Sequence, residues 1–290
     1  MSGGVGTPLA VAGSCELIWV DGPDAASFLQ GILTNDVARL DAGESCPALI
    51  LDNKGHIRGA MRVVRTGAQA FTLVTGPGEG EPLVGLLDEY HFSEDVDVIG
   101  AEAFAAVTLH RPAPASIAGA DLVIAGDIPG TIDAIGVEAE AIVAALGATP
   151  GSPVDLEILR VEAGVPRFGV DFTAANLVQE AGLETTAVSF DKGCYLGQET
   201  VARVAYRGRV NRRLRGLVLP APTAAGRAVR HDGRDVGLVT SSVVSPRLGP
   251  IALAMIRNDV DADASIEVEG LDGPVRVVEL PFTKPLHREQ

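Results

Sequence analysis

From Leu214 onward the sequence shows strand-like patterns only, and this change of pattern constrains the fold more than any other feature of the chain. From there on, turns containing Gly, Pro or Asp separate short strand-like runs at 214–219, 236–244, 251–256, 265–268 and 275–280. No helical period appears among them, and several short strands at this spacing are typical of a small barrel. We therefore predict a C-terminal β-barrel over residues 214–290, which is about 75 residues long.

The chain before the barrel mixes helical and strand patterns. A helix-start signal at 22–24 precedes an apolar helical face over 25–33, and strand-like runs follow at 48–52, 56–65 and 70–75. After a strand-like run at 96–99, a second block repeats this mixture, with strand-like runs at 104–109, 122–125 and 131–135 and helices over 138–146 and from Pro153 to Gly164. Short antiparallel strands mixed with helices indicate an α+β fold, with a first part at 9–100 and a second part at 101–213.

The most unusual segment is 192–200, Lys-Gly-Cys-Tyr-Leu-Gly-Gln-Glu-Thr. From residue 196 onward it reads as the opening of a helix, which places Cys194 just outside a helix N-terminus. The positive end of the helix dipole and the cation of Lys192 both favour a thiolate there, so the segment predicts a reactive cysteine with a lowered pKa. The alternative is a buried, inert cysteine beside a tight turn, which is the usual state of a cysteine taken at random.

Composition excludes several functional classes. Asp and Glu outnumber Lys and Arg by 38 to 23, and the formal charge of -15 argues against broad nucleic-acid binding. The three cysteines have no CxxC spacing, so they form neither a disulfide framework nor, by themselves, a metal site. No secretory signal and no run of about 18 apolar residues is visible, so we expect a cytoplasmic protein without a membrane span.

Two further segments carry candidate binding groups. Six arginines gather in 203–215 of an otherwise acidic chain, and they form either an anion-binding wall or a solvated strand face. The stretch 160–171 ends a helix with Arg160 and Glu162 and then turns at Gly and Pro residues. A buried carboxylate there would accept two N–H donors from an amidine-like edge, such as the 2-amino-4-oxo face of a pterin. The alternative, which chemistry alone favours, is a helix-end salt bridge between Arg160 and a neighbouring acid.

Three segments together form a recognisable set. They are Asp-Ala-Ala-Ser-Phe-Leu-Gln-Gly-Ile-Leu-Thr-Asn-Asp-Val at 24–37, Leu-Asp-Asn-Lys-Gly at 51–55, and 192–199 followed by Val-Ala-Arg at 201–203. In these segments the chain resembles the YgfZ family, which are folate-binding proteins related to the aminomethyltransferase (T-protein) of the glycine cleavage system. The resemblance extends from about Leu17 to Ile256, and the Lys-Gly-Cys-Tyr-x-Gly-Gln-Glu core is its most specific part.

The resemblance implies a T-protein-like fold, in which two ferredoxin-like α+β parts and a C-terminal β-barrel surround a central channel that binds tetrahydrofolate. It also implies a role in assembling or repairing iron–sulfur clusters. The partners would be client enzymes, including radical-SAM enzymes, or cluster assembly proteins. A cluster would be bound only transiently or on the client, because one cysteine supplies one of the roughly four ligands that a cluster needs. No nucleic-acid or membrane partner is expected.

The resemblance also assigns the site residues. Cys194 matches the family's motif cysteine and Lys192 its neighbouring lysine, and these two form the predicted catalytic pair. The T-protein pattern Lys-x-x-Phe-x-Gly matches Lys192, Tyr195 and Gly197, so these residues would shape a folate pocket to which Cys194 is added. Glu162 stands at the place of the T-protein glutamate that contacts the pterin. The predicted folate contacts are Asn35, Asp36, Glu162, Lys192, Tyr195, Gln198, Glu199 and Arg203.

One departure from the T-protein pattern bears on the activity. The T-protein presents an aspartate after its first hairpin turn, whereas Arg58 and Gly59 stand at that place here. A cation cannot accept a proton as a carboxylate does, so aminomethyl transfer is disfavoured and a classical enzyme is not expected. Two alternatives stay open: a folate-dependent one-carbon transferase or demethylase, and a non-catalytic folate sensor.

Overall fold

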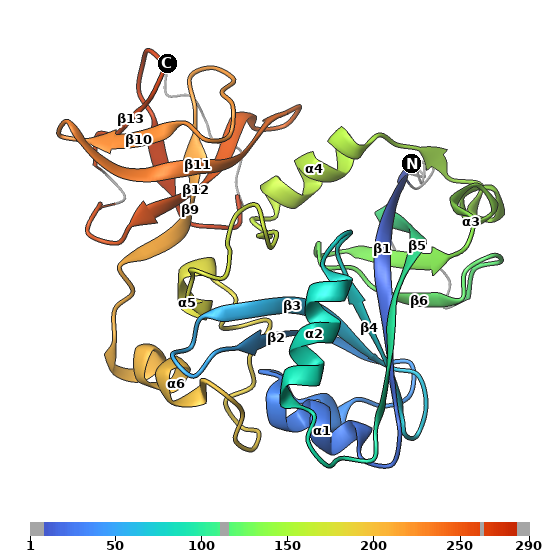
Figure 1. Cartoon of the computed structure of the whole chain (residues 1–290). Coiled ribbons are helices and arrows are strands. Elements are labelled where there is room, and N and C mark those ends of the chain that lie inside the picture. The colour runs from blue at the N-terminus through green and yellow to red at the C-terminus, as the bar shows by residue number, and fades with distance from the viewer. Residues whose placement is uncertain (1–8, 111–115, 262–263, 283–290) are drawn as a thin grey trace, which may run out of the picture. The chain divides into compact units, whose positions relative to one another are not determined.

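The computed structural model describes residues 9–110, 116–261 and 264–282 (Figure 1). The chain divides into two compact units. The first contains the described parts of Met1–Asn53, Arg58–Leu156 and Thr186–Gln198, and the second those of Lys54–Ile57, Glu157–Thr185 and Glu199–Gln290. The three parts expected from the sequence stay a prediction, and the last residues of the predicted barrel, 283–290, lie outside the described residues.

A largely antiparallel sheet forms the framework of the first unit, with the strand order β2-β3-β4-β1-β5-β7-β6 and β8 beside β1. These strands are β1 (Leu9–Asp21), β2 (Ser45–Leu51), β3 (Ile57–Arg65), β4 (Ala70–Thr75), β5 (Asp97–His110), β6 (Leu122–Ala125), β7 (Thr131–Gly136) and β8 (Thr149–Pro150). β1 and β5 pair antiparallel along nearly their whole length, so they join the two halves of the sheet. Residues 96–99 and 104–109, which the sequence predicts as separate strands, therefore belong almost entirely to the one strand β5.

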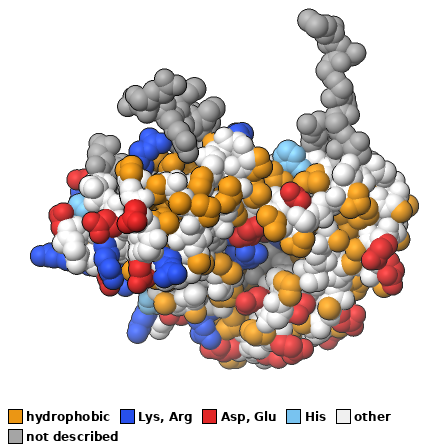
Figure 2. Space-filling model, turned by 90° about the horizontal axis from the view of Figure 1, so that it is seen from above, with side chains coloured by type: hydrophobic (Ala, Val, Ile, Leu, Met, Phe, Trp, Pro, Cys, Tyr) orange, Lys and Arg blue, Asp and Glu red, His pale blue; other side chains and the backbone are white. Residues whose placement is uncertain are grey.

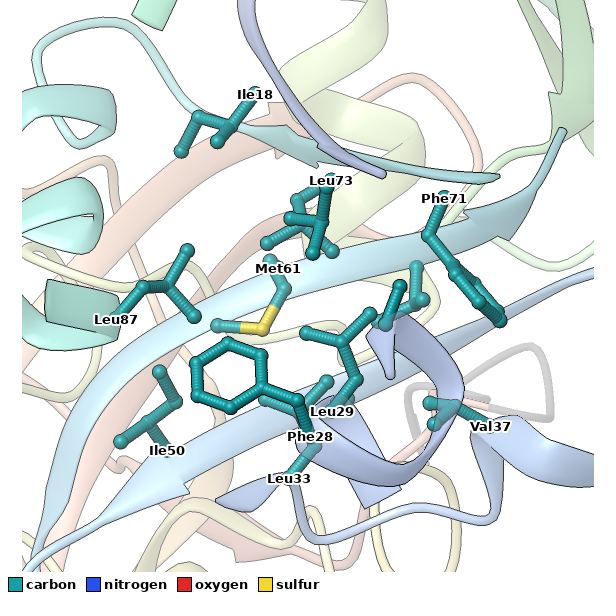
Figure 3. Packing of buried hydrophobic residues seen from close by; sticks show 14 of the residues in the cluster. Ile18, Phe28, Leu29, Leu33, Val37, Ile50, Met61, Phe71, Leu73 and Leu87 are labelled. Carbon is teal, nitrogen blue, oxygen red and sulfur yellow. The ribbon is translucent and has the colours of Figure 1, made fainter. Parts of the chain in front are cut away.

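Helices α1 (Ala25–Ile32) and α2 (Gly80–Tyr90) pack with the sheet around one apolar core. Side chains alternate between the two faces of a strand, and Ile18 and Val20 of β1 point into this core. Phe28 and Leu29 of α1 lie against the sheet, as Figure 3 shows. Burial of each such side chain contributes roughly 1.5–3 kcal/mol, and this packing fixes the position of α1.

The opposite face of the same sheet is concave. Cys15 and Leu17 of β1 meet Ile135 of β7 in a second apolar cluster. Arg62 of β3 binds Asp127, which follows β6, with 2.5 Å between Nη2 and Oδ1. Because β3 and β6 lie near opposite ends of the strand order, this ion pair shows that the sheet curls around that face. The third helix, α3 (Ala139–Leu146), packs on β5 and β7.

The second unit contains the predicted β-barrel. Its strands pair in the order β13-β10-β11-β12-β9-β14. They are β9 (Arg212–Val218), β10 (Ala228–His231), β11 (Arg234–Ser245), β12 (Gly249–Arg257), β13 (Glu267–Val268) and β14 (Arg276–Val278). A bridge between Ile266 and Val275, which lie beside the two outer strands, closes the barrel. Leu217, Val229 and Val239 are fully buried in its core. The sequence predicts every strand of this barrel except the short β10.

Three helices connect the sheet region and the barrel along the chain: α4 (Pro153–Glu162), α5 (Val178–Ala181) and α6 (Gln198–Arg207). α4 begins at the predicted proline and ends just before Gly164, whose φ of 68° suits a helix C-terminus. Val161, near the end of α4, is buried against Leu214 and Ile251 of the barrel. Among the described residues, no helix is both long and apolar enough to cross a membrane.

Candidate functional site

The segment 192–197, just before α6, contains both buried and exposed residues. Lys192 and Tyr195 are buried, whereas Cys194 is exposed. Gly197 has a φ of 80°, a left-handed conformation that glycine adopts without strain, and it directly precedes α6. The predicted position of Cys194 outside a helix N-terminus is therefore confirmed, and the alternative of a buried cysteine is wrong.

The Lys192 ammonium lies at the C-terminal end of α1. Its Nζ donates hydrogen bonds to the main-chain oxygens of Gln30 and Leu33, each at 2.6 Å, and of Asn35 at 3.1 Å. An ammonium group has three N–H donors, so all of them are used by these carbonyls. The free carbonyls at a helix C-terminus carry a partial negative charge, which favours a cation there. Burial lowers the pKa of Lys192 to about 8, and Asp36 opposes this shift.

Tyr195 completes the buried side of the segment. Its ring centroid lies 5.1 Å from Nζ of Lys192, within the range of a cation–π contact. Burial raises the pKa of the Tyr195 hydroxyl to about 12, so the side chain is neutral at physiological pH. Tyr195 thus packs against the buried cation, while Cys194 next to it in the chain faces outward.

The turn after α1 also holds the residues just before this segment. The hydroxyl of the fully buried Thr34 donates to the Ala187 oxygen at 2.6 Å and accepts from the Leu49 N–H at 2.9 Å. The main-chain oxygen of Thr34 accepts from the Ser189 N–H at 3.0 Å. Thr34 cannot be identified as a site residue from the sequence, because nothing local shows that its hydroxyl bridges two distant segments.

Asn35 and Asp36, two predicted folate contacts, belong to this turn. The Asn35 amide donates to the oxygens of Pro47 at 2.8 Å and Thr186 at 3.2 Å, and its oxygen accepts from the Asp36 N–H at 2.9 Å. The Asp36 carboxylate accepts from the Gln30 amide at 2.9 Å. Both side chains therefore hold protein segments together in the structure, and their direct contact with folate stays a prediction.

Gln198, Glu199 and Arg203 lie in the first turns of α6. Glu199 and Arg203 form an ion pair at 3.1 Å, and both side chains are largely exposed. An exposed pair four residues apart on a helix contributes only about 0.3–0.5 kcal/mol, so both groups remain available to a ligand at little energetic cost. The structure leaves their predicted contact with folate untested.

A buried polar cluster lies where α4 meets the barrel in the second unit. Arg160 donates to Asp171 at 2.6 Å and to the Ser241 hydroxyl at 2.6 Å, and it also pairs with Glu157. The Asp171 side chain is fully buried, and it accepts further hydrogen bonds from Ser241 and Thr240. The helix-end salt bridge considered from the sequence is therefore present, with Glu157 and Asp171 as its acids.

Glu162 lies at the end of the same helix. One of its carboxylate oxygens accepts a hydrogen bond from the Ser245 hydroxyl, and the other pairs with Arg247 at 2.7 Å. Only 13% of the Glu162 side chain is exposed. A carboxylate has about four acceptor positions, so these two partners leave acceptor capacity unused.

The arginine stretch 203–215 is not a purely basic wall. Arg213 pairs with Glu184 and Arg215 with Glu279, in addition to the pair of Arg203 on α6. Burial and the neighbouring Arg213 lower the pKa of Arg215. On the face drawn in Figure 2, basic side chains likewise lie among acidic ones. An anionic ligand at this stretch would have to compete with carboxylates that are already bound.

The other two cysteines differ from Cys194 in their surroundings. Burial raises the pKa of Cys15 to about 12 and that of Cys46 to about 11. Both are therefore neutral thiols at physiological pH and poor nucleophiles. Among the described residues, no group of three or more His, Cys, Asp or Glu side chains is arranged to hold a metal ion.

Known proteins are similar to this chain in both sequence and fold. Residues 212–284 match the model of the glycine cleavage T-protein C-terminal barrel domain. A tRNA-modifying protein YgfZ from Photobacterium profundum is 29% identical over 84% of this chain and 82% of that protein. An aminomethyltransferase from Streptomyces avermitilis is 28% identical over 91% of this chain and 83% of that protein.

A solved structure extends the similarity to the fold. The crystal structure of glycine cleavage system aminomethyltransferase T from Bartonella henselae has a TM-score of 0.82. It covers 96% of this chain and 87% of its own, at 21% identity. The predicted T-protein-like α+β fold with a C-terminal barrel is therefore confirmed.

Proposed function

We propose that this chain binds tetrahydrofolate and assists the assembly or repair of iron–sulfur clusters in client enzymes, a proposal supported by its similarity to a YgfZ protein and to aminomethyltransferases. The Cys194 thiol is the group that acts in this role. The observation that carries the proposal is the exposure of Cys194 beside two buried side chains, Lys192 and Tyr195. A thiol has to be accessible to reach a cluster, a persulfide or a client thiol, and this one is.

The remaining cysteines do not suit this role. Cys15 and Cys46 are held as neutral thiols by burial, so Cys194 is the cysteine available for exchange chemistry. One thiolate supplies one of the roughly four ligands of a cluster. The cluster is therefore cargo that passes through a complex with a client, such as a radical-SAM enzyme, or with an assembly protein. The sparse, unpaired cysteines suit the reducing cytoplasm, where we place this function.

Tetrahydrofolate is the proposed bound ligand. Glu162 is its proposed pterin contact, because the carboxylate is mostly buried and retains acceptor capacity beside Ser245 and Arg247. The pterin edge presents adjacent N–H donors, which a carboxylate accepts as a pair. Arg203, exposed on α6, is the proposed contact for the carboxylates of the ligand's glutamate tail, and the exposed Glu199 is proposed to accept from an N–H group of the ligand.

Transfer RNA is not proposed as a ligand of this chain, although the YgfZ relative is named a tRNA-modifying protein. Phosphate backbones are bound by basic surfaces, and this chain has a formal charge of -15. Its arginine-rich stretch also carries ion pairs with carboxylates, as in Arg213 with Glu184. The proposed role is therefore exerted on client enzymes and not on RNA directly.

A folate-dependent one-carbon transferase or demethylase is the second candidate, favoured by the aminomethyltransferase relatives. Arg58, at the place of a T-protein acid, pairs with Glu89 at 3.6 Å and offers no carboxylate for that chemistry. Folate-dependent turnover of glycine or a methylamine, lost in Glu162→Gln, would establish this candidate. Tight tetrahydrofolate binding without any effect of Cys194→Ala would instead indicate a folate sensor.

The proposed function is tested in a strain that lacks this protein. The strain is complemented with the native chain, with Cys194→Ala, or with the control Cys46→Ala, and the activity of cluster-dependent enzymes is measured. We expect the native chain and Cys46→Ala to restore the activity, and Cys194→Ala to fail at equal protein levels. Full restoration by Cys194→Ala would exclude the proposed role of the thiol.

A further inference from the structure

We propose that Lys192 acts as a positioning residue, which together with Thr34 clamps the Cys194 segment (residues 186–195) onto the end of α1. This inference rests on the proposed function of the Cys194 thiol, but it concerns how that thiol is held. Two attachments join the segment to residues 30–35, which stand more than 150 positions earlier in the chain: Lys192 binds the main-chain oxygens of residues 30, 33 and 35, and Thr34 binds the main chain at 187 and 189.

The first attachment uses the complete donor capacity of the ammonium. Two of its acceptors, the oxygens of Gln30 and Leu33, lie at 2.6 Å, and the third, of Asn35, lies at 3.1 Å. No N–H remains for a substrate or for the neighbouring thiol. The carbonyls are also held rigidly, because α1 is anchored in the apolar core by Phe28.

The second attachment is neutral. The Thr34 hydroxyl donates to the Ala187 oxygen at 2.6 Å and accepts from the Leu49 N–H at 2.9 Å, so it ties the segment to β2. The Ser189 N–H adds a main-chain bond to the Thr34 oxygen at 3.0 Å. A fully buried hydroxyl that bridges two main chains restrains both, because its removal leaves two buried polar groups unpaired.

Groups around the ammonium offset part of the cost of its burial, which lowers the pKa of Lys192 to about 8. The Asp36 carboxylate is its charged neighbour, and the Tyr195 ring lies 5.1 Å away. These groups and the carbonyl acceptors favour the cation at a fixed place. The consequence is that the backbone just before Cys194 is pinned, while the thiol itself faces outward.

The clamp is tested by two variants that remove one attachment each. Lys192→Met removes the charge and the donors, whereas Thr34→Val removes only the hydroxyl and changes no charge. Hydrogen exchange of 186–195 and the pH profile of Cys194 alkylation are measured on the purified full chain. We expect exchange of the Ser189 amide to accelerate by about 10-fold or more in both variants, as befits the loss of one or two buried hydrogen bonds. The pH midpoint of Cys194 alkylation should match that of the native chain in both variants.

A direct chemical role of Lys192 would give a different pattern. In that case Lys192→Met alone would move the alkylation midpoint, exchange in 186–195 would stay as in the native chain, and the positioning role would be overturned. Thr34→Ser, which keeps the hydroxyl, is the matched control and should behave as the native chain. If Lys192→Met does not fold, Thr34→Val decides, because unchanged exchange in that variant also overturns the clamp. These measurements need no client, so their failure is distinct from a failure of the complementation test.

Discussion

Replacing Gly193 by Ala should leave the folded state unstrained and make the protein slightly more stable. A Cβ at residue 193 would meet no atom within 4 Å, and Gly193 is not among the residues with positive φ. An alanine there restricts mainly the unfolded chain, which stabilises a protein by about 0.4–1 kcal/mol. For a protein of this size, that corresponds to a rise in melting temperature of about 1–3 °C.

The second glycine of the same segment provides the matched control. Gly197 has a φ of 80°, a conformation in which an L side chain is strained by about 1–2 kcal/mol. Gly197→Ala should therefore lower the melting temperature by about 3–6 °C, in the opposite direction to Gly193→Ala. Calorimetric or circular-dichroism melting of the two variants measures both changes.

A fall of the melting temperature by more than about 3 °C in Gly193→Ala would refute this account of the segment. A melting temperature of Gly197→Ala equal to that of the native chain would do the same. Gly193→Ala also has a use beyond stability, because it adds bulk beside the exposed Cys194 without disturbing the fold. A loss of cluster-dependent enzyme activity with Gly193→Ala in the complementation assay would then indicate that the added methyl group obstructs a partner that approaches the thiol.

Three further predictions follow from buried groups. Asp171→Asn leaves the buried Arg160 without the fully buried one of its two acids and should lower the free energy of unfolding by about 3 kcal/mol in urea titrations; an unchanged value would contradict the buried pair. Glu162→Gln should weaken tetrahydrofolate binding about 10-fold or more in calorimetry, whereas unchanged affinity would remove Glu162 from the folate site. Burial raises the pKa of Cys15 from 9.0 to about 12, so the unfolded chain releases this proton at lower pH than the folded chain does. Stability should therefore fall as the pH rises above about 9, by up to about 1.4 kcal/mol per pH unit, and Cys15→Ala should fall less steeply; parallel curves would contradict the shift.

Local patterns in the sequence predict much of this fold. The helix after residue 24, the helix that begins at Pro153 and most barrel strands depend on capping residues and periodicity that are read within a few residues. The single strand β5 is missed, because Gly100 and the exposed residues around it interrupt the apolar pattern. Its continuity comes from pairing with β1, which the local sequence does not display.

The candidate site is predictable in its residues but not in their contacts. Motif resemblance identifies Lys192, Cys194 and Glu162, and the structure places Cys194 at the surface just before α6, the helix expected there. The acceptors of Lys192 stand about 160 positions earlier in the chain, and the partners of Glu162 lie in the barrel, more than 80 positions later. Such long-range hydrogen bonds depend on the tertiary fold, so spacing in the sequence carries no signal for them.

Calorimetric titration of tetrahydrofolate into the purified chain is the most direct test of the proposed folate binding. We expect saturable binding of one tetrahydrofolate per chain in the native protein. We also expect the same affinity for Cys194→Ala, because in the proposed role the thiol acts on clusters and not on folate. Absence of a saturable heat of binding in the native chain would contradict the claim that this is a folate-binding protein.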